Sequence, residues 1–132
     1  MNSQLEYIVK KPDELNKKSS VINQDLTPYI DRILPYLDQK FGGFQGSPKF
    51  PQFYVFETLF YFYRKNKEEK YLEPVEKLLF NVCSRGLYDH LSGGIARYTV
   101  DAEWVIPHFE KMLYDNILFV AVSYTHLTLP TK

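Results

Sequence analysis

The chain has 132 residues, of which 45% are hydrophobic and 24% are charged, enough for one domain with a modest core. Its 16 basic and 16 acidic residues cancel, so no net field attracts nucleic acid or an anionic membrane, and neither is predicted as a partner. No segment approaches the roughly 18 to 20 apolar residues that span a bilayer, and the N-terminus lacks the apolar centre of a signal peptide. The single cysteine, Cys83, cannot form an internal disulfide, and metal-ligand spacing is absent. The composition therefore predicts a cytoplasmic protein with no metal and no cofactor.

The first part of the chain changes from a polar lead-in to a helix and then to a loop. Residues 1–25 have only scattered apolar positions, which indicates a linker. Thr27 and Pro28 are typical of a helix N-cap and first helical residue, and Pro35 should kink or divide the helix that follows. Residues 41–52, FGGFQGSPKFPQ, contain three glycines and two prolines, which favours an ordered loop over a flexible tether.

Two further helices are predicted in the middle of the chain. Residues 52–66 are apolar nearly all the way round, so this helix should be buried on most sides. A third helix is expected to begin near Tyr71, with Pro74 in its first turn and Gly86 as its stop signal. Because 17% of the residues are aromatic, an aromatic core is favoured over an aromatic-lined pocket.

The last third of the chain has a long loop and one more predicted helix. Residues 87–106 lose the helical period and alternate briefly at 95–100, which indicates a loop with a small β-hairpin. Pro107 should open the fourth helix. After Val120 the helical stripe fails, and the sequence VSYTHLTLPT resembles a translated transposon-end adapter from sequencing libraries. Residues 121–132 are therefore expected to be an artefact.

Ionisable and aromatic side chains gather between the third and fourth helices. A carboxylate beside an imidazole can serve as acid and base, while Trp and Tyr offer flat faces to a sugar ring, so a small polar ligand is predicted. The candidates are Lys49 from the first loop and Asp89, His90, Arg97, Tyr98, Asp101, Trp104, His108, Glu110, Lys111, Tyr114 and Asp115.

Some of these candidates have structural alternatives. Spacing of i, i+3 and i+7 would place His108, Lys111 and Asp115 on one helix face, pointing into a cavity, although His108 could instead buttress the loop. The adjacent side chains of Asp89 and His90 should diverge, which favours structural roles for both.

Four other side chains are also open to two interpretations. Arg97 could clamp an anionic or hydroxylated ligand or hold the loop by pairing with Asp115. Trp104 is favoured as a pin for the loop over a stacking platform. Lys49 could present its amine to a pocket or serve the loop alone, and for Cys83 a buried, inert thiol is favoured over a reactive one.

Two segments resemble the paired signatures of the thioredoxin-domain-containing family of the spermatogenesis-associated type. They are FGGFQGSPKFP at 41–51 and LYDHLSGGIARYTVDAEWVIPHFEKMLYDN at 87–116, and the resemblance extends over roughly residues 25–120. The chain departs mildly from the family pattern at Gln45, Ser47 and Ile95.

The resemblance implies a larger protein, in which a thioredoxin-like domain precedes an α/α toroid similar to six-hairpin glycosidases and N-acylglucosamine 2-epimerases. Residues 26–120 would then form about two helical hairpins of an all-α, partial toroid. The twelve candidate residues would contribute to its cavity wall, with His108, Asp101 and Asp89 as catalytic candidates and the other nine as substrate-binding ones. The implied function is binding or conversion of a carbohydrate-like substrate. The alternative is a non-catalytic scaffold module that partners the thioredoxin-like domain, and whether the protein is an enzyme stays open.

Overall fold

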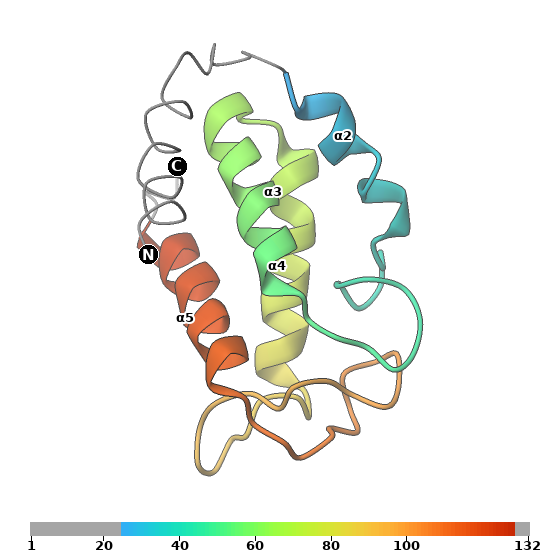
Figure 1. Ribbon diagram of the computed structural model, residues 1–132, viewed down its shortest axis with the longest axis vertical. Coiled ribbons are helices and arrows are strands. Elements are labelled where there is room, and N and C mark those ends of the chain that lie inside the picture. The colour runs from blue at the N-terminus through green and yellow to red at the C-terminus, as the bar shows by residue number, and fades with distance from the viewer. Residues whose placement is uncertain (1–24, 129–132) are drawn as a thin grey trace, which may run out of the picture.

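The structure is a computed structural model that describes residues 25–128, and it is mostly helical. In chain order its elements are α2 (Thr27–Asp31), the 3-10 turn η1 (Leu34–Tyr36), α3 (Phe53–Asn66), α4 (Glu69–Ser84) and α5 (Leu113–Thr128). Helix α3 packs against both α4 and α5, and the long loops gather at one end of these three helices (Figure 1). The predicted helical class is confirmed, while most of the predicted lead-in lies outside the described residues.

The first helix is divided, as the proline predicted. Helix α2 ends at Asp31, and Pro35 lies within the separate turn η1. A proline cannot donate the backbone hydrogen bond that would continue the helix. The hydroxyl of Tyr71, on α4, donates to the Asp31 carboxylate at 2.7 Å and ties this first segment to the hairpin that follows.

Helices α3 and α4 form an antiparallel hairpin close to the predicted bounds. On α3, Tyr54 and Tyr61 are 58% and 61% exposed, so the expectation of burial on most sides is wrong for that face. Helix α4 begins at Glu69, and Pro74 therefore lies inside the helix instead of in its first turn. The predicted aromatic core is confirmed, since its buried members include Phe53, Phe56, Phe60, Phe62, Tyr71 and Trp104.

Helix α5 begins six residues later than predicted, at Leu113 instead of Pro107. The preceding segment is extended, because the N–H of His108 donates to the carbonyl of Tyr98 and the N–H of Arg97 donates to that of Glu110. These pairings use the backbone groups that a helix would need. In place of the predicted β-hairpin, the described part of the chain has only isolated bridges, with no strand.

The C-terminal part of α5 continues past the point where its apolar stripe fails. Phe119 and Val122 are buried, and the helix extends to Thr128. The adapter interpretation of 121–132 stays a prediction. Among the described residues, no helix is long and apolar enough to cross a membrane.

Candidate functional site

The twelve predicted site residues all lie at the loop end of the helices, in the two long loops or the first turn of α5. The structure does not bring them into one cluster. It divides them among separate groups, each with its own hydrogen-bond or stacking partners. Two clefts of 390 and 530 Å³ flank α4, and neither is lined by any of the twelve.

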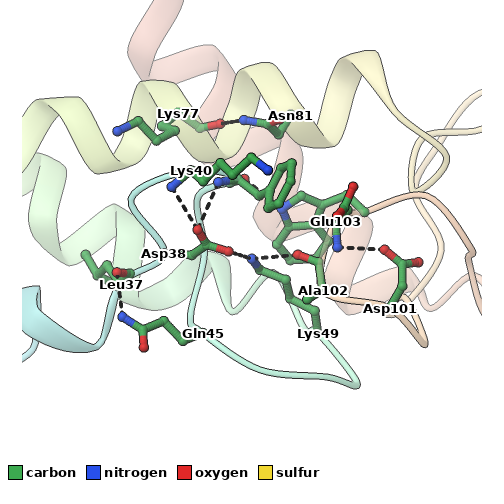
Figure 2. Close-up of polar contacts among 12 residues, drawn as sticks. Leu37, Asp38, Lys40, Gln45, Lys49, Lys77, Asn81, Asp101, Ala102 and Glu103 are labelled. Carbon is green, nitrogen blue, oxygen red and sulfur yellow. Dashed lines mark hydrogen bonds and ion pairs between the residues drawn. The ribbon is translucent and has the colours of Figure 1, made fainter.

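Lys49 is buried at the junction of the two loops (Figure 2). Its side chain is only 1% exposed, and its ammonium group donates to the Asp38 carboxylate and, at 3.0 Å, to the carbonyl of Ala102. The Trp104 ring lies 5.0 Å from the same nitrogen. Lys49 therefore fastens the first loop to the second, which supports its structural interpretation.

Asp38 is the partner that the sequence analysis missed. Its carboxylate accepts the backbone N–H groups of Lys40 and Phe41 as well as the Lys49 ammonium. Burial raises the pKa of Asp38, but the bond from Lys49 and the two backbone bonds outweigh burial and lower it. The sequence signal for this role was an aspartate four and five residues before the paired glycines Gly42 and Gly43.

Trp104 pins the second loop against the first, as favoured from the sequence. The indole is fully buried, and its Nε1–H donates to the carbonyl of Phe41 at 2.9 Å. A Cβ on Gly43 would lie 2.6 Å from an indole carbon, so the ring sits directly against the glycine backbone. Because no face of the indole is accessible in this chain, Trp104 offers no stacking platform here.

Asp101 closes the tight turn that contains Trp104. Its carboxylate accepts backbone N–H bonds from Glu103, Val105 and Ile106. Burial raises the pKa of Asp101, but these bonds to the charged form outweigh burial and lower it. A carboxylate held in this way stays ionised and fixes the loop.

Asp89 and His90 diverge, as expected for adjacent residues in an extended loop. Asp89 accepts from the Lys111 ammonium and from the N–H groups of Leu91 and Ser92, and these bonds, with Lys111 first, lower its pKa. His90 Nε2 instead lies 3.2 Å from the carbonyl of Arg85. They do not form an acid–base pair.

Three rings form a stack at the loop end. Tyr98 lies between Phe50, at 4.6 Å between ring centroids, and His108, at 4.7 Å with only 12° between the ring planes. Pairing of the Lys49 backbone with Thr99, and of His108 with Tyr98, brings the three segments together. Phe50 is 37% exposed and His108 is exposed, so the stack is accessible at both ends. Phe50 was not among the predicted residues.

The remaining polar residues surround the start of α5. Arg97 lies 3.9 Å from Glu110 and 6.0 Å from the centre of the Tyr114 ring. The pairing of Arg97 with Asp115 that was considered from the sequence is absent among the described salt bridges. One oxygen of Asp115 is buried with no hydrogen-bond partner within residues 25–128, and burial raises the pKa of this carboxyl, against the opposing effect of Arg97.

Two expectations about single residues are wrong. His108 and Lys111 do not share a helix face with Asp115, because only Asp115 lies within α5.

The single cysteine, Cys83, lies on α4. Its side chain is exposed, not buried as expected, although desolvation by its surroundings still raises the pKa of its thiol. A thiol with a raised pKa carries little thiolate at neutral pH, so the expected low reactivity still follows. Over residues 25–128, no three His, Cys, Asp or Glu side chains converge as a metal site would require.

The described residues thus define a class of structure: helical hairpins whose long loops carry an accessible stack of three rings, with a carboxyl group of raised pKa in the first turn of α5. No family model matches the chain. It is 33% identical over 92 residues to Spermatogenesis-associated protein 20 of Homo sapiens, which covers 67% of this chain, and 34% identical over 92 residues to that of Mus musculus. An uncharacterized protein of Caenorhabditis elegans is 40% identical over 88 residues. In each case the chain spans 12% of the length of the relative, so it shares partial homology with these proteins.

Proposed function

We propose that this chain corresponds to a segment of a larger protein, in which its loop end forms part of the wall of a carbohydrate-binding site within an α/α toroid. The partial homology to much longer proteins and the succession of helical hairpins support this arrangement. On this proposal residues 26–120 are the hairpins, 1–25 lead into them, and 121–132 are not part of the natural protein.

We infer a carbohydrate as the ligand from the stack of Phe50, Tyr98 and His108. Flat aromatic faces bind the apolar faces of sugar rings, and a few polar groups beside them fix the orientation of the ligand. Arg97 and Tyr114, whose guanidinium carbon and ring centre are 6.0 Å apart, are the polar groups that we propose for this role. A site open at both ends of the stack suits a ring-shaped, polyhydroxylated ligand.

Asp115 and His108 are the residues that we propose for acid–base chemistry, in hydrolysis or epimerisation. A general acid must hold its proton near neutral pH, and burial shifts the pKa of Asp115 in that direction. Asp89 and Asp101 fit this role less well, because hydrogen bonds lower the pKa of both. The sequence predicted His108, Asp101 and Asp89 as catalytic candidates, and we now propose Asp115 in place of the two aspartates.

The test is carbohydrate binding by full-length protein that carries this segment. Replacing Phe50, an accessible end of the stack, with Ala should weaken binding by about 2- to 12-fold, the equivalent of an aromatic stacking contact of roughly 0.5–1.5 kcal/mol. Tyr98→Ala should weaken binding too, because it removes the ring that lies between Phe50 and His108. Tyr54→Ala is the matched control, because Tyr54 is an exposed ring on α3 outside the stack. Binding that is unchanged in both Tyr98→Ala and His108→Ala would rule out the ring stack as a sugar platform.

The second candidate is a non-catalytic scaffold module that serves a thioredoxin-like domain. It is favoured by the fact that Lys49, Asp89 and Asp101 all hold loops in place. Crosslinking that captures a partner only in one redox state would support this function. Conversion of a sugar by the purified full-length protein, lost in Asp115→Asn, would dispose of it.

A further inference from the structure

Two loops in this chain have the same backbone structure. They are YLDQKFGGFQ at 36–45 and LYDHLSGGIA at 87–96. Each has an aspartate at its third position and two glycines with positive φ at its seventh and eighth. The bridge between Leu37 and Phe44 in the first loop corresponds to that between Tyr88 and Ile95 in the second.

The hydrogen bonds of the first loop centre on Asp38. Its N–H donates to the carbonyl of Gly43 at 2.8 Å, and its carbonyl accepts from the N–H of Gly42 at 3.0 Å. Its side chain accepts the N–H groups of the residues two and three positions later, Lys40 and Phe41.

The second loop repeats every one of these bonds around Asp89. The N–H of Asp89 donates to Gly94 at 2.8 Å, and its carbonyl accepts from Gly93 at 2.9 Å. Its side chain accepts the N–H groups of Leu91 and Ser92, again two and three positions later. The chain thus contains two copies of one unit, in which a helical segment, this Asp-centred loop and a second helix follow in order.

Both units also have a lysine after the loop that donates to the second oxygen of the aspartate. In the first unit Lys49 pairs with Asp38, and their side chains are 1% and 15% exposed. In the second Lys111 pairs with Asp89, and their side chains are 38% and 32% exposed. The same ion pair is buried in one unit and open to solvent in the other.

The long loop of the second unit is what covers the pair in the first. Ala102 accepts a hydrogen bond from the Lys49 ammonium, Trp104 lies over it, and Thr99 pairs with the Lys49 backbone in both directions. Lys111 donates instead to Gly93 of its own loop at 2.8 Å, and an ammonium group has three donors, so a further carbonyl can still be bound.

Exposed apolar side chains also lie near the Asp89–Lys111 pair along the chain. Leu91, Phe109 and Leu113 each lie two residues along the chain from Asp89 or Lys111, and they are 98%, 88% and 77% exposed. Apolar side chains exposed together around a polar pair are typical of protein interaction surfaces.

We propose that the Asp89–Lys111 pair and these three apolar residues form a docking surface for the long loop of a third helix–loop–helix unit of the same kind. The incoming loop brings a backbone carbonyl to the Lys111 ammonium and an aromatic ring over it, as the 97–110 loop does for Lys49. This interface rests on the proposal that the chain is a segment of a larger protein with further hairpins, but not on the proposed ligand, because the ring stack contains neither Asp89 nor Lys111.

The probe is a cyclic peptide of residues 97–110, whose ends adjoin in the structure because the Arg97 N–H bonds to the Glu110 carbonyl at 2.8 Å. Acetylation of individual lysines in the 132-residue chain is followed by mass spectrometry, with and without peptide. Saturating peptide should slow labelling of Lys111 roughly tenfold, since a docked interface excludes water from its centre. Labelling of Lys67, an exposed lysine at the turn between α3 and α4, should not change.

A peptide with Trp104→Ala leaves the protein unaltered and should not protect Lys111. Asp89→Asn in the chain should also weaken peptide binding, because it releases Lys111 from its fixed position. No protection of Lys111, or equal protection by the Trp104→Ala peptide, overturns the proposal. Protection that grows with chain concentration in the absence of peptide overturns it too, because a second copy of the chain would then be the occupant.

Discussion

At the scale of single residues, burial separates side chains that look alike in the sequence. Lys49 and Lys111 both follow an Asp-centred loop and pair with its aspartate, yet only the side chain of Lys49 is buried. Asp101 and Asp115 are both carboxylates, yet the pKa of Asp101 is lowered and that of Asp115 is raised. Sequence spacing alone could not predict these differences, because burial depends on contacts between distant segments.

Lys49→Ala should destabilise the chain by about 3–5 kcal/mol, because it leaves the Asp38 carboxylate as a partly buried charge without its partner. Lys111→Ala is the matched control and should cost much less, since exposed ion pairs contribute little. Urea denaturation followed by circular dichroism gives both values. Equal losses for the two variants would contradict the difference in burial.

The stability of the chain should also depend on pH through Asp115. Because burial raises its pKa, the folded state favours the protonated carboxyl, and stability is lost as the pH rises from the usual value of 3.8 through the raised one. Asp115→Asn removes this penalty, so the variant should melt at a higher temperature than the natural chain at pH 7 and at the same temperature at pH 3. Asp101→Asn should behave in the opposite way, with its greatest destabilisation at pH 7. A lower melting temperature of Asp115→Asn at pH 7 would mean that its charged form is stabilised in the fold.

At the scale of elements, local patterns predicted the helices well and the loops poorly. The apolar periodicity and proline positions placed α3 and α4 within a few residues, because both signals act within one element. The start of α5 was predicted wrongly, since residues 107–110 pair with 97–99 across the loop. The ring stack depends on this pairing and on that of the Lys49 backbone with Thr99, and the second of these joins segments far apart in the sequence, which explains why Phe50 was missed.

The glycine-rich loop at 41–52 requires glycine for two different reasons, which can be separated by substitution. Gly42 has a φ of +71°, and a Cβ there would lie 2.6 Å from the backbone nitrogen of Leu78. Gly46 has a φ of +107° but no atom within 4 Å of an added Cβ. Gly46→Ala should cost about 1–3 kcal/mol from backbone strain alone. Gly42→Ala should cost more, because α4 must also move, and similar unfolding free energies for the two variants would show that the close approach to α4 is relaxed in solution.

At the scale of the whole molecule, the chain leaves many apolar side chains exposed. On the part of α5 before residue 121 alone, Leu113, Ile117 and Val120 are 77%, 58% and 60% exposed. Contiguous apolar surface of this kind is rare on proteins that act alone. It is consistent with the proposal that the chain is a segment of a larger protein.

Sequencing of the source genome across the codons for residues 118–132 should show a reading frame that diverges from this chain after about Val120. The reason is that residues 122–131, VSYTHLTLPT, resemble a translated sequencing adapter, although the helix itself continues to Thr128. A genomic sequence that matches the chain to Lys132 would show that the tail is natural, and the toroid proposal would then fail for this chain.

The intrinsic fluorescence of Trp104 can report on the contact between the two units. It is the single tryptophan, and it is fully buried where the second unit meets the first loop. Its emission should therefore be shifted to short wavelength in the folded chain and should move to longer wavelength as soon as the two units separate, even while the helices persist. A red shift that precedes the loss of the helical circular dichroism signal would measure how tightly one unit holds the next.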